Sequence, residues 1–132
     1  MLIRSILQKI PVFWRKLVWG DLEMNETQIE SVLQQIIALL KKHQVHQWTD
    51  VLENLERTFS EACLSGDKKA KLYALEEMGQ LYGGMGSFND LQITHIGGHN
   101  IAPQEEITVN ETLNSLRNQL GQLLENVGES DN

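Results

Sequence analysis

Two histidines four positions apart are the first residues in this sequence that could do chemistry. His95 and His99 follow Asp90 in a stretch rich in polar groups. On a helix this spacing would aim both imidazoles at one metal ion, and imidazole is a common metal ligand. Gly97 and Gly98 stand between the two histidines and disfavour a helix there. We therefore keep metal binding as an alternative, and we expect no cofactor.

A nucleophile could come from Ser87 or Cys63. Together with a histidine and Asp90, Ser87 would supply the residue types of a hydrolytic site. Ser87 precedes Asn89 and Asp90, however, and these polar side chains typically form the hydrogen bonds of turns. Cys63 falls on the apolar face of a helical pattern, where a free cysteine is usually packed and unreactive. The sequence therefore predicts no catalytic residue.

Three glycines occur within the four residues 83–86, which is the most unusual local feature of the chain. Such a cluster is expected where the backbone takes a positive φ or passes close to another surface. A phosphate-binding loop would need a lysine followed by serine or threonine, and this loop has no basic residue. We interpret it as a structural turn formed by Gly83, Gly84, Gly86 and Ser87.

Apolar and acidic side chains surround the glycines and could contact a partner protein. A few buried anchors, with charges that steer the approach, are typical of binding surfaces. The predicted partner-binding residues are Glu76, Glu77, Tyr82, Met85, Phe88, Asn89 and Asp90.

The elements that must position these residues are predicted to be helices. Apolar residues recur at helical spacing over residues 27–43, 49–66, 67–82 and 108–127. Capping patterns place the helix starts at Thr27, Thr49 and Thr108, and near Asp67. Because the connections are short, neighbouring helices should run antiparallel.

The predicted fold class is mainly α, a small bundle of four or five helices with a glycine-rich loop. A short β-hairpin turning at Gly97 and Gly98 is expected before the last long helix. We expect residues 1–22 to form a basic, apolar helical extension and residues 23–128 a single helical domain. Residues 129–132 form a polar tail.

The net charge of -7 disfavours nucleic-acid binding and suits a basic partner. Residues 1–20 are the exception, because they carry basic side chains and no acidic one. This segment could pack on the domain, on a partner, or on an anionic membrane. A single cysteine fits a reducing compartment, so a cytoplasmic location is expected.

The stretch Tyr82–Leu91, with the sequence YGGMGSFNDL, resembles the signature of a small bacterial domain family of unknown function. Residues 110–117, NETLNSLR, resemble a second element of that family's pattern. The resemblance covers roughly residues 25–127, and residues 1–20 and 97–107 look like additions to it. It implies a cytoplasmic bacterial protein and specifies no activity.

Two functional hypotheses follow. The first is a non-enzymatic protein-binding module, in the form of an immunity or antitoxin-like protein that neutralises a basic toxin. The alternative is a small ligand- or metal-binding protein, able to hydrolyse its ligand, with Asp90, His95 and His99 at its site. The leucine stripe of residues 113–127 could pack internally or join two copies in a homodimer.

Overall fold

The computed structural model describes residues 21–83 and 86–130, so the predicted N-terminal extension of residues 1–20 lies outside the described residues. The described part contains four α-helices: α3 (Asp21–Lys42), α4 (His46–Ser65), α5 (Lys68–Gly79) and α6 (Glu106–Ser130). Three short 3₁₀ helices accompany them, η1 (Gln80–Tyr82), η2 (Phe88–Asp90) and η3 (Pro103–Glu105). The mainly α fold class is confirmed. None of the helices described is long and apolar enough to cross a membrane.

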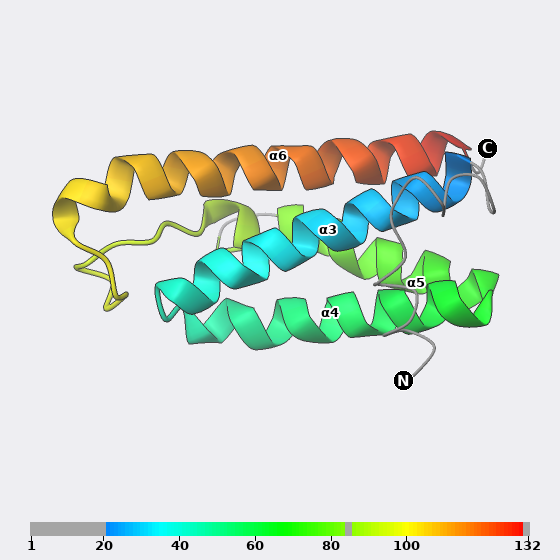
Figure 1. Cartoon of the computed structure of the whole chain (residues 1–132), viewed down its shortest axis with the longest axis horizontal. Coiled ribbons are helices and arrows are strands. Elements are labelled where there is room, and N and C mark those ends of the chain that lie inside the picture. Colours follow the sequence, from blue (N-terminus) through cyan, green and yellow to red (C-terminus); the bar gives the residue numbers. More distant parts are fainter. Residues whose placement is uncertain (1–20, 84–85, 131–132) are drawn as a thin grey trace.

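Consecutive helices run in opposite directions, as the short connections predict (Figure 1). Helix α3 packs against both α4 and α6, and α5 packs mainly on α4. The start of α3 and the end of α6 lie together at one end of the bundle. The irregular segment between η2 and η3 lies at the opposite end (Figure 1).

The core forms where the apolar stripes of the helices meet. The predicted stripes of α3 and α6 are both buried; they comprise Ile29, Val32, Leu33, Ile36, Ile37 and Leu40 on α3, and Leu113, Leu116, Leu120 and Val127 on α6. Burying one such aliphatic side chain stabilises a fold by about 1.5–3 kcal/mol. Most of the α6 stripe therefore packs within its own chain.

The helix starts predicted at Thr27, Thr49 and Thr108 are wrong. Helices α3, α4 and α6 begin earlier, at Asp21, His46 and Glu106. The Thr49 hydroxyl donates to the Val45 carbonyl oxygen at 2.8 Å, which is a bond back along the helix and not a cap. A Ser/Thr-x-x-Glu pattern also fits inside a helix, where it marks no boundary.

The start of α5 follows the prediction. Asp67 takes an extended conformation just before the helix, and its Oδ1 accepts a hydrogen bond from the Ala70 amide at 3.1 Å. Gly66 ends α4 with a φ of 72°. A left-handed glycine followed by an aspartate cap makes the sharp reversal between α4 and α5.

The connection between α3 and α4 depends on a non-glycine residue in the left-handed region. Gln44 has a φ of 57°. The Val45 amide donates to the Leu40 carbonyl at 2.9 Å, and the Gln44 amide donates to the Lys41 carbonyl at 3.2 Å. These two bonds form a Schellman motif, a helix ending in which glycine usually occupies the left-handed position.

We predict that Gln44→Gly raises the free energy of unfolding by about 0.5–1 kcal/mol, because glycine adopts this φ without the steric cost of a side chain. Gln28→Gly, at an exposed site inside α3, should lower it by about 1 kcal/mol. Urea unfolding followed by circular dichroism measures both changes. If both variants lowered the free energy of unfolding by the same amount, Gln44 would not be strained.

Candidate functional site

The glycine loop lies between η1 and η2 and is closed by Asp90. Gly86 has a φ of 78°, a conformation that glycine adopts without strain. Its amide donates to Asp90 Oδ2 at 2.9 Å, and the Asp90 amide donates to the Ser87 carbonyl at 3.0 Å. Gly84 and Met85 lie outside the described residues. The carboxylate of Asp90 therefore has a local role in holding the turn.

Phe88 fixes the loop to the core. Its side chain is fully buried, and its ring centroid lies 5.4 Å from that of Trp48. This corrects the expectation that Phe88 contacts a partner, because a side chain with no exposed surface cannot reach another protein while the core stays closed. The sequence pattern marks the turn, but it does not distinguish the inward aromatic from an outward one.

A buried arginine on α6 holds the loop from the other side. Arg117 is 2% exposed, and its Nη1 donates to the carbonyl oxygens of Phe88 at 2.7 Å and Leu91 at 3.0 Å. Its Nη2 donates to Asn114 Oδ1. The guanidinium also lies over the Phe88 ring, 5.6 Å from its centroid. Arg117 thus supplies a donor to the Leu91 carbonyl and a second donor to the Phe88 carbonyl, which also accepts from the Leu91 amide at 3.1 Å.

Burial gives this arginine and its neighbour Tyr82 unusual acid–base properties. Desolvation lowers the pKa of Arg117, and the neighbouring Tyr82 and Asp90 oppose that shift. The Tyr82 hydroxyl donates to the Arg117 carbonyl oxygen at 2.6 Å. Tyr82, predicted as a partner contact, is half-buried and joins η1 to α6.

Sequence reasoning did not assign Arg117 this role, although a signal was present. Arg117 is the only lysine or arginine after Lys71, and it falls within the leucine stripe of the last helix. A cation at a core-facing position needs partners from another segment, and loop carbonyls are suitable ones.

The predicted β-hairpin is wrong, since the described residues contain no strand. The side chain of Asn110 takes the place of a partner strand. Its Oδ1 accepts from the Ile93 amide at 2.8 Å, and its Nδ2 donates to the Ile93 carbonyl at 2.9 Å. Nδ2 also donates to the Glu106 carbonyl at 2.8 Å. A single amide on α6 thus satisfies both backbone groups of the buried Ile93, and no ladder is needed.

His43 holds the irregular segment in a similar way, at the end of α3. The Asn100 amide donates to the His43 carbonyl at 2.8 Å. The His43 Nδ1 is 2.8 Å from the Asn100 carbonyl oxygen, which assigns the proton to Nδ1. His43 is 3% exposed, so this pair joins α3 to the loop inside the protein.

His95 and His99, the alternative metal ligands, both lie in a turn. The Nδ1 of His99 accepts from the Thr94 amide at 3.0 Å, so this nitrogen already has a structural partner. The His95 amide donates to Glu106 Oε1 at 2.7 Å. Across residues 21–83 and 86–130, no three His, Cys, Asp or Glu side chains gather in a way that could hold a metal ion.

The thiol of Cys63 lies in a polar contact between three helices. Burial, together with the carboxylate of Glu26, raises the pKa of this thiol well above its usual range. Glu26 on α3 also pairs with Lys71 on α5 at 2.8 Å. A thiol held in its protonated form is a poor nucleophile, so Cys63 has a packing role.

The outer face of α5 brings together the acidic residues predicted to bind a partner and two apolar residues that the prediction missed. Leu72 is 40% exposed and Tyr73 is 59% exposed. Glu76 is exposed, Glu77 is half-buried, and a hydrogen bond to Glu77 raises the pKa of Tyr73. We call these four residues the α5 surface. Asn89 and Asp90 are also exposed, on η2.

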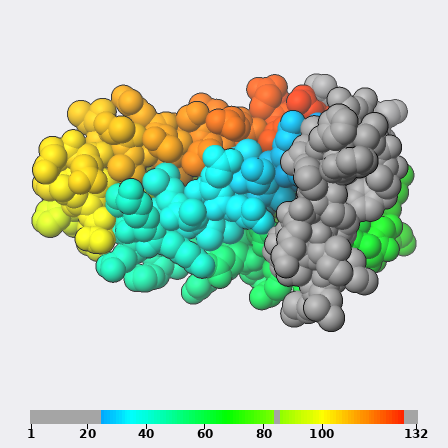
Figure 2. Space-filling view, viewed as in Figure 1, coloured from blue at the N-terminus to red at the C-terminus, as the bar shows by residue number. Residues whose placement is uncertain are grey.

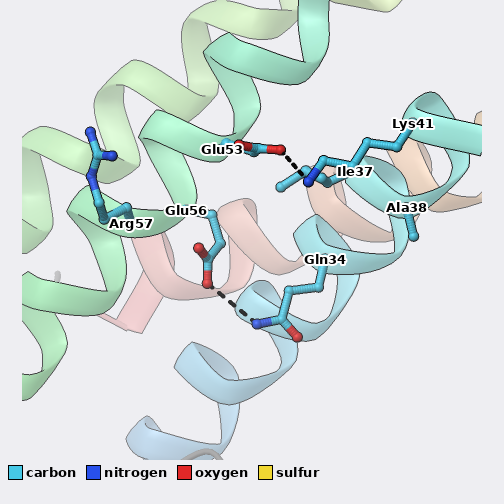
Figure 3. Close-up of a pocket in the computed structure, with 7 residues that line it drawn as sticks. All are labelled: Gln34, Ile37, Ala38, Lys41, Glu53, Glu56 and Arg57. Atoms are coloured by element: carbon cyan, nitrogen blue, oxygen red, sulfur yellow. Dashed lines mark hydrogen bonds and ion pairs between the residues drawn. The ribbon is translucent and has the colours of Figure 1, made fainter. Parts of the chain in front are cut away.

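The groove drawn in Figure 3 lies between α3 and α4, away from the predicted residues. Its lining residues are Gln34, Ile37, Ala38, Lys41, Glu53, Glu56 and Arg57. Lys41 pairs with Glu53 at 2.6 Å, and Gln34 donates to Glu56 at 3.3 Å (Figure 3). The guanidinium of Arg57 points away from these two pairs (Figure 3). The polar groups pair across the two helices, so we assign this groove to helix packing.

The chain was compared with models of known protein families, with curated proteins and with solved structures. The model of a family described as "Domain of unknown function (DUF6966)" matches residues 41–102. The matched segment includes the glycine loop and ends before α6, which supplies Asn110 and Arg117. No curated protein and no solved structure matches the chain.

We predict that Asn110→Asp lowers the free energy of unfolding by about 2–3 kcal/mol at pH 7, because a carboxylate oxygen would face the carbonyls of Ile93 and Glu106. The loss should shrink at pH 4, where the carboxyl is partly protonated and can donate again. Asn114→Asp is the matched control, since its oxygen still accepts from Arg117. Urea unfolding should show the control within about 0.5 kcal/mol of the parent. Equal losses in the two variants would contradict the role of Asn110.

Burial raises the pKa of Tyr82 to about 12. An unfolded chain ionises its tyrosines near pH 10. The neutral phenol therefore contributes stability below about pH 10, and this contribution is lost as the pH rises from about 10 to 12. We predict that the parent is more stable than Tyr82→Phe by about 1 kcal/mol at pH 8. Denaturant unfolding at pH 8, 10 and 11.5 should show the difference shrinking, and a constant difference would contradict the shift.

Proposed function

We propose that this protein is a non-enzymatic protein-binding module whose contact surface is the α5 surface. The exposed Tyr73 beside Glu77 is the observation that supports this most directly. A tyrosine offers a large, stiff contact area and a polar end, which is why it is common among residues that dominate binding. Glu77, one helical turn away, raises the pKa of Tyr73 through a side-chain hydrogen bond and places a negative charge beside the phenol.

The partner is a protein with a basic surface. Residues 72–116 contain six acidic residues and no lysine or arginine. This segment includes the whole α5 surface and the exposed Asp90. Negative charges around an apolar contact accelerate association with a basic protein and disfavour acidic ones. Neutralisation of a bacterial toxin in the cytoplasm is the specific form of this proposal, since a small acidic protein can block a basic active surface by covering it.

The alternative, a metal or hydrolytic site at Asp90, His95 and His99, gains no support from the geometry. Asp90 holds the Gly86 amide, and His99 holds the Thr94 amide. The side chains of the α5 surface, all within the described part of the chain, hold no backbone amide in this way. We therefore place binding ahead of catalysis.

We predict that Tyr73→Ala and the double variant Glu76→Lys, Glu77→Lys each weaken partner binding by tenfold or more. The partner is first captured with the tagged full-length protein in its own cells, then purified and titrated by calorimetry. Glu61→Lys, an exposed charge reversal on α4, is the matched control and should bind within threefold of the parent. If the partner is a toxin, co-expression of the parent should restore growth and Tyr73→Ala should not.

The proposal fails if the α5 variants bind like the parent or if Glu61→Lys weakens binding as much as they do. If the affinity for the captured protein were unchanged in both the Tyr73 and the glutamate variants, the contact would lie elsewhere.

A further inference from the structure

A second, separate feature of the surface is a fully exposed isoleucine. Ile96 is 98% exposed, the highest value among the large apolar side chains of the described residues. It lies in the turn of residues 94–99, which we call the Ile96 turn. Ile107, 76% exposed, lies at the start of α6. The His95 amide donates to Glu106 Oε1 at 2.7 Å, which ties the turn to the start of α6.

The Ile96 turn has a well-defined conformation. The His99 amide donates to the Thr94 carbonyl at 3.1 Å, and the Gly98 amide donates to the His95 carbonyl at 3.0 Å. The Thr94 hydroxyl accepts from the Gly97 amide at 2.9 Å. A Cβ at position 97 would lie 2.7 Å from that hydroxyl, so a larger residue there would displace Thr94 Oγ1 and its hydrogen bond. Backbone and side chain together hold Ile96 outward.

An exposed isoleucine on a rigid turn is suited to binding. The turn is closed by backbone and polar groups, so its folding does not depend on an apolar residue at position 96. A partner that buries Ile96 gains its full apolar surface and loses little conformational entropy, because the turn is already ordered. Since isoleucine is also β-branched, its side chain itself has few rotamers to lose.

The charged residues near the Ile96 turn indicate what kind of partner could bind it. The segment forms one end of the molecule, at the start of α6 (Figure 2). Glu105 and Glu106 directly precede Ile107, Glu106 accepts from the His95 amide next to Ile96, and residues 72–116 contain no lysine or arginine. An anionic membrane would be repelled by these charges.

We propose that Ile96 is an anchor that inserts into an apolar socket on another protein, and that lysines or arginines rim this socket. The Ile96 turn is separate from the α5 surface, and its segment lies at the end of the bundle where α6 begins (Figure 1). It provides a second point of contact, either with the same partner or with another one.

The test uses a photo-crosslinking amino acid placed at position 96 of the full-length protein in its own cells. Val51, an exposed β-branched residue on α4, is the matched control position. We expect a cross-link to a different protein from position 96 and none from position 51. The cross-linked peptide should come from a region with aliphatic or aromatic residues beside lysine or arginine. A cross-link to a second copy of this chain, or no cross-link, would overturn the proposal.

Titration of the purified partner then tests the anchor itself. Ile96→Asp should weaken binding tenfold or more, Ile96→Val by less than threefold, and Val51→Asp by less than threefold. Because Ile96 contributes no core packing, its variants should melt like the parent. Equal affinities for Ile96→Asp and the parent would overturn the proposal. So would binding of the parent to phosphatidylglycerol vesicles that Ile96→Asp abolishes. If Tyr73→Ala lost binding while the Ile96 variants bound like the parent, the contact would be the α5 surface and Ile96 would be excluded.

Discussion

The insertion of Arg117 into the loop is the interaction on which the arrangement of this protein depends. A guanidinium has five N–H donors and no acceptor, so it can be buried only where several oxygens converge. The turn at η2 supplies the carbonyls of Phe88 and Leu91, and α6 itself supplies Asn114. The loop and the helix are therefore stable only together. Their joint geometry exposes Asn89 and Asp90 while Phe88 stays inside.

Two further residues, Asn110 on α6 and His43 directly after α3, form hydrogen bonds with the backbone of the segment that follows the turn. The Asn110 side chain bonds to both the amide and the carbonyl of Ile93, whereas His43 accepts from the Asn100 amide through its backbone carbonyl and donates to the Asn100 carbonyl through Nδ1. Irregular backbone can be buried because side chains replace the regular ladder. The outer end of this segment is then free to expose residues such as Ile96 that play no part in packing.

The periodic features of this protein were predictable, and the non-local ones were not. The stripes from Ile29 to Leu40 and from Leu113 to Val127 follow from helical spacing, because burial selects every third or fourth residue. Helix starts at Thr27 and Thr108 were misplaced, since a capping pattern is local and the residues before it can still be helical. The hairpin was expected because β-capable residues flank Gly97 and Gly98, whereas Asn110, distant in sequence, had already satisfied the backbone of Ile93. Exposure of Tyr73 and burial of Phe88 likewise depend on which helices lie nearby.

The position of Arg117 in the chain also bears on how the protein folds during synthesis. The loop at Phe88 leaves the ribosome before the helix that holds it, because α6 begins only at Glu106. The antiparallel α3–α4–α5 unit can dock as soon as it is made, since its contacts are between successive helices. The turn acquires its donors only when α6 has emerged and packed on α3. A chain that ends before Arg117 would therefore leave the turn without this donor and the α3 stripe without most of the helix that covers it.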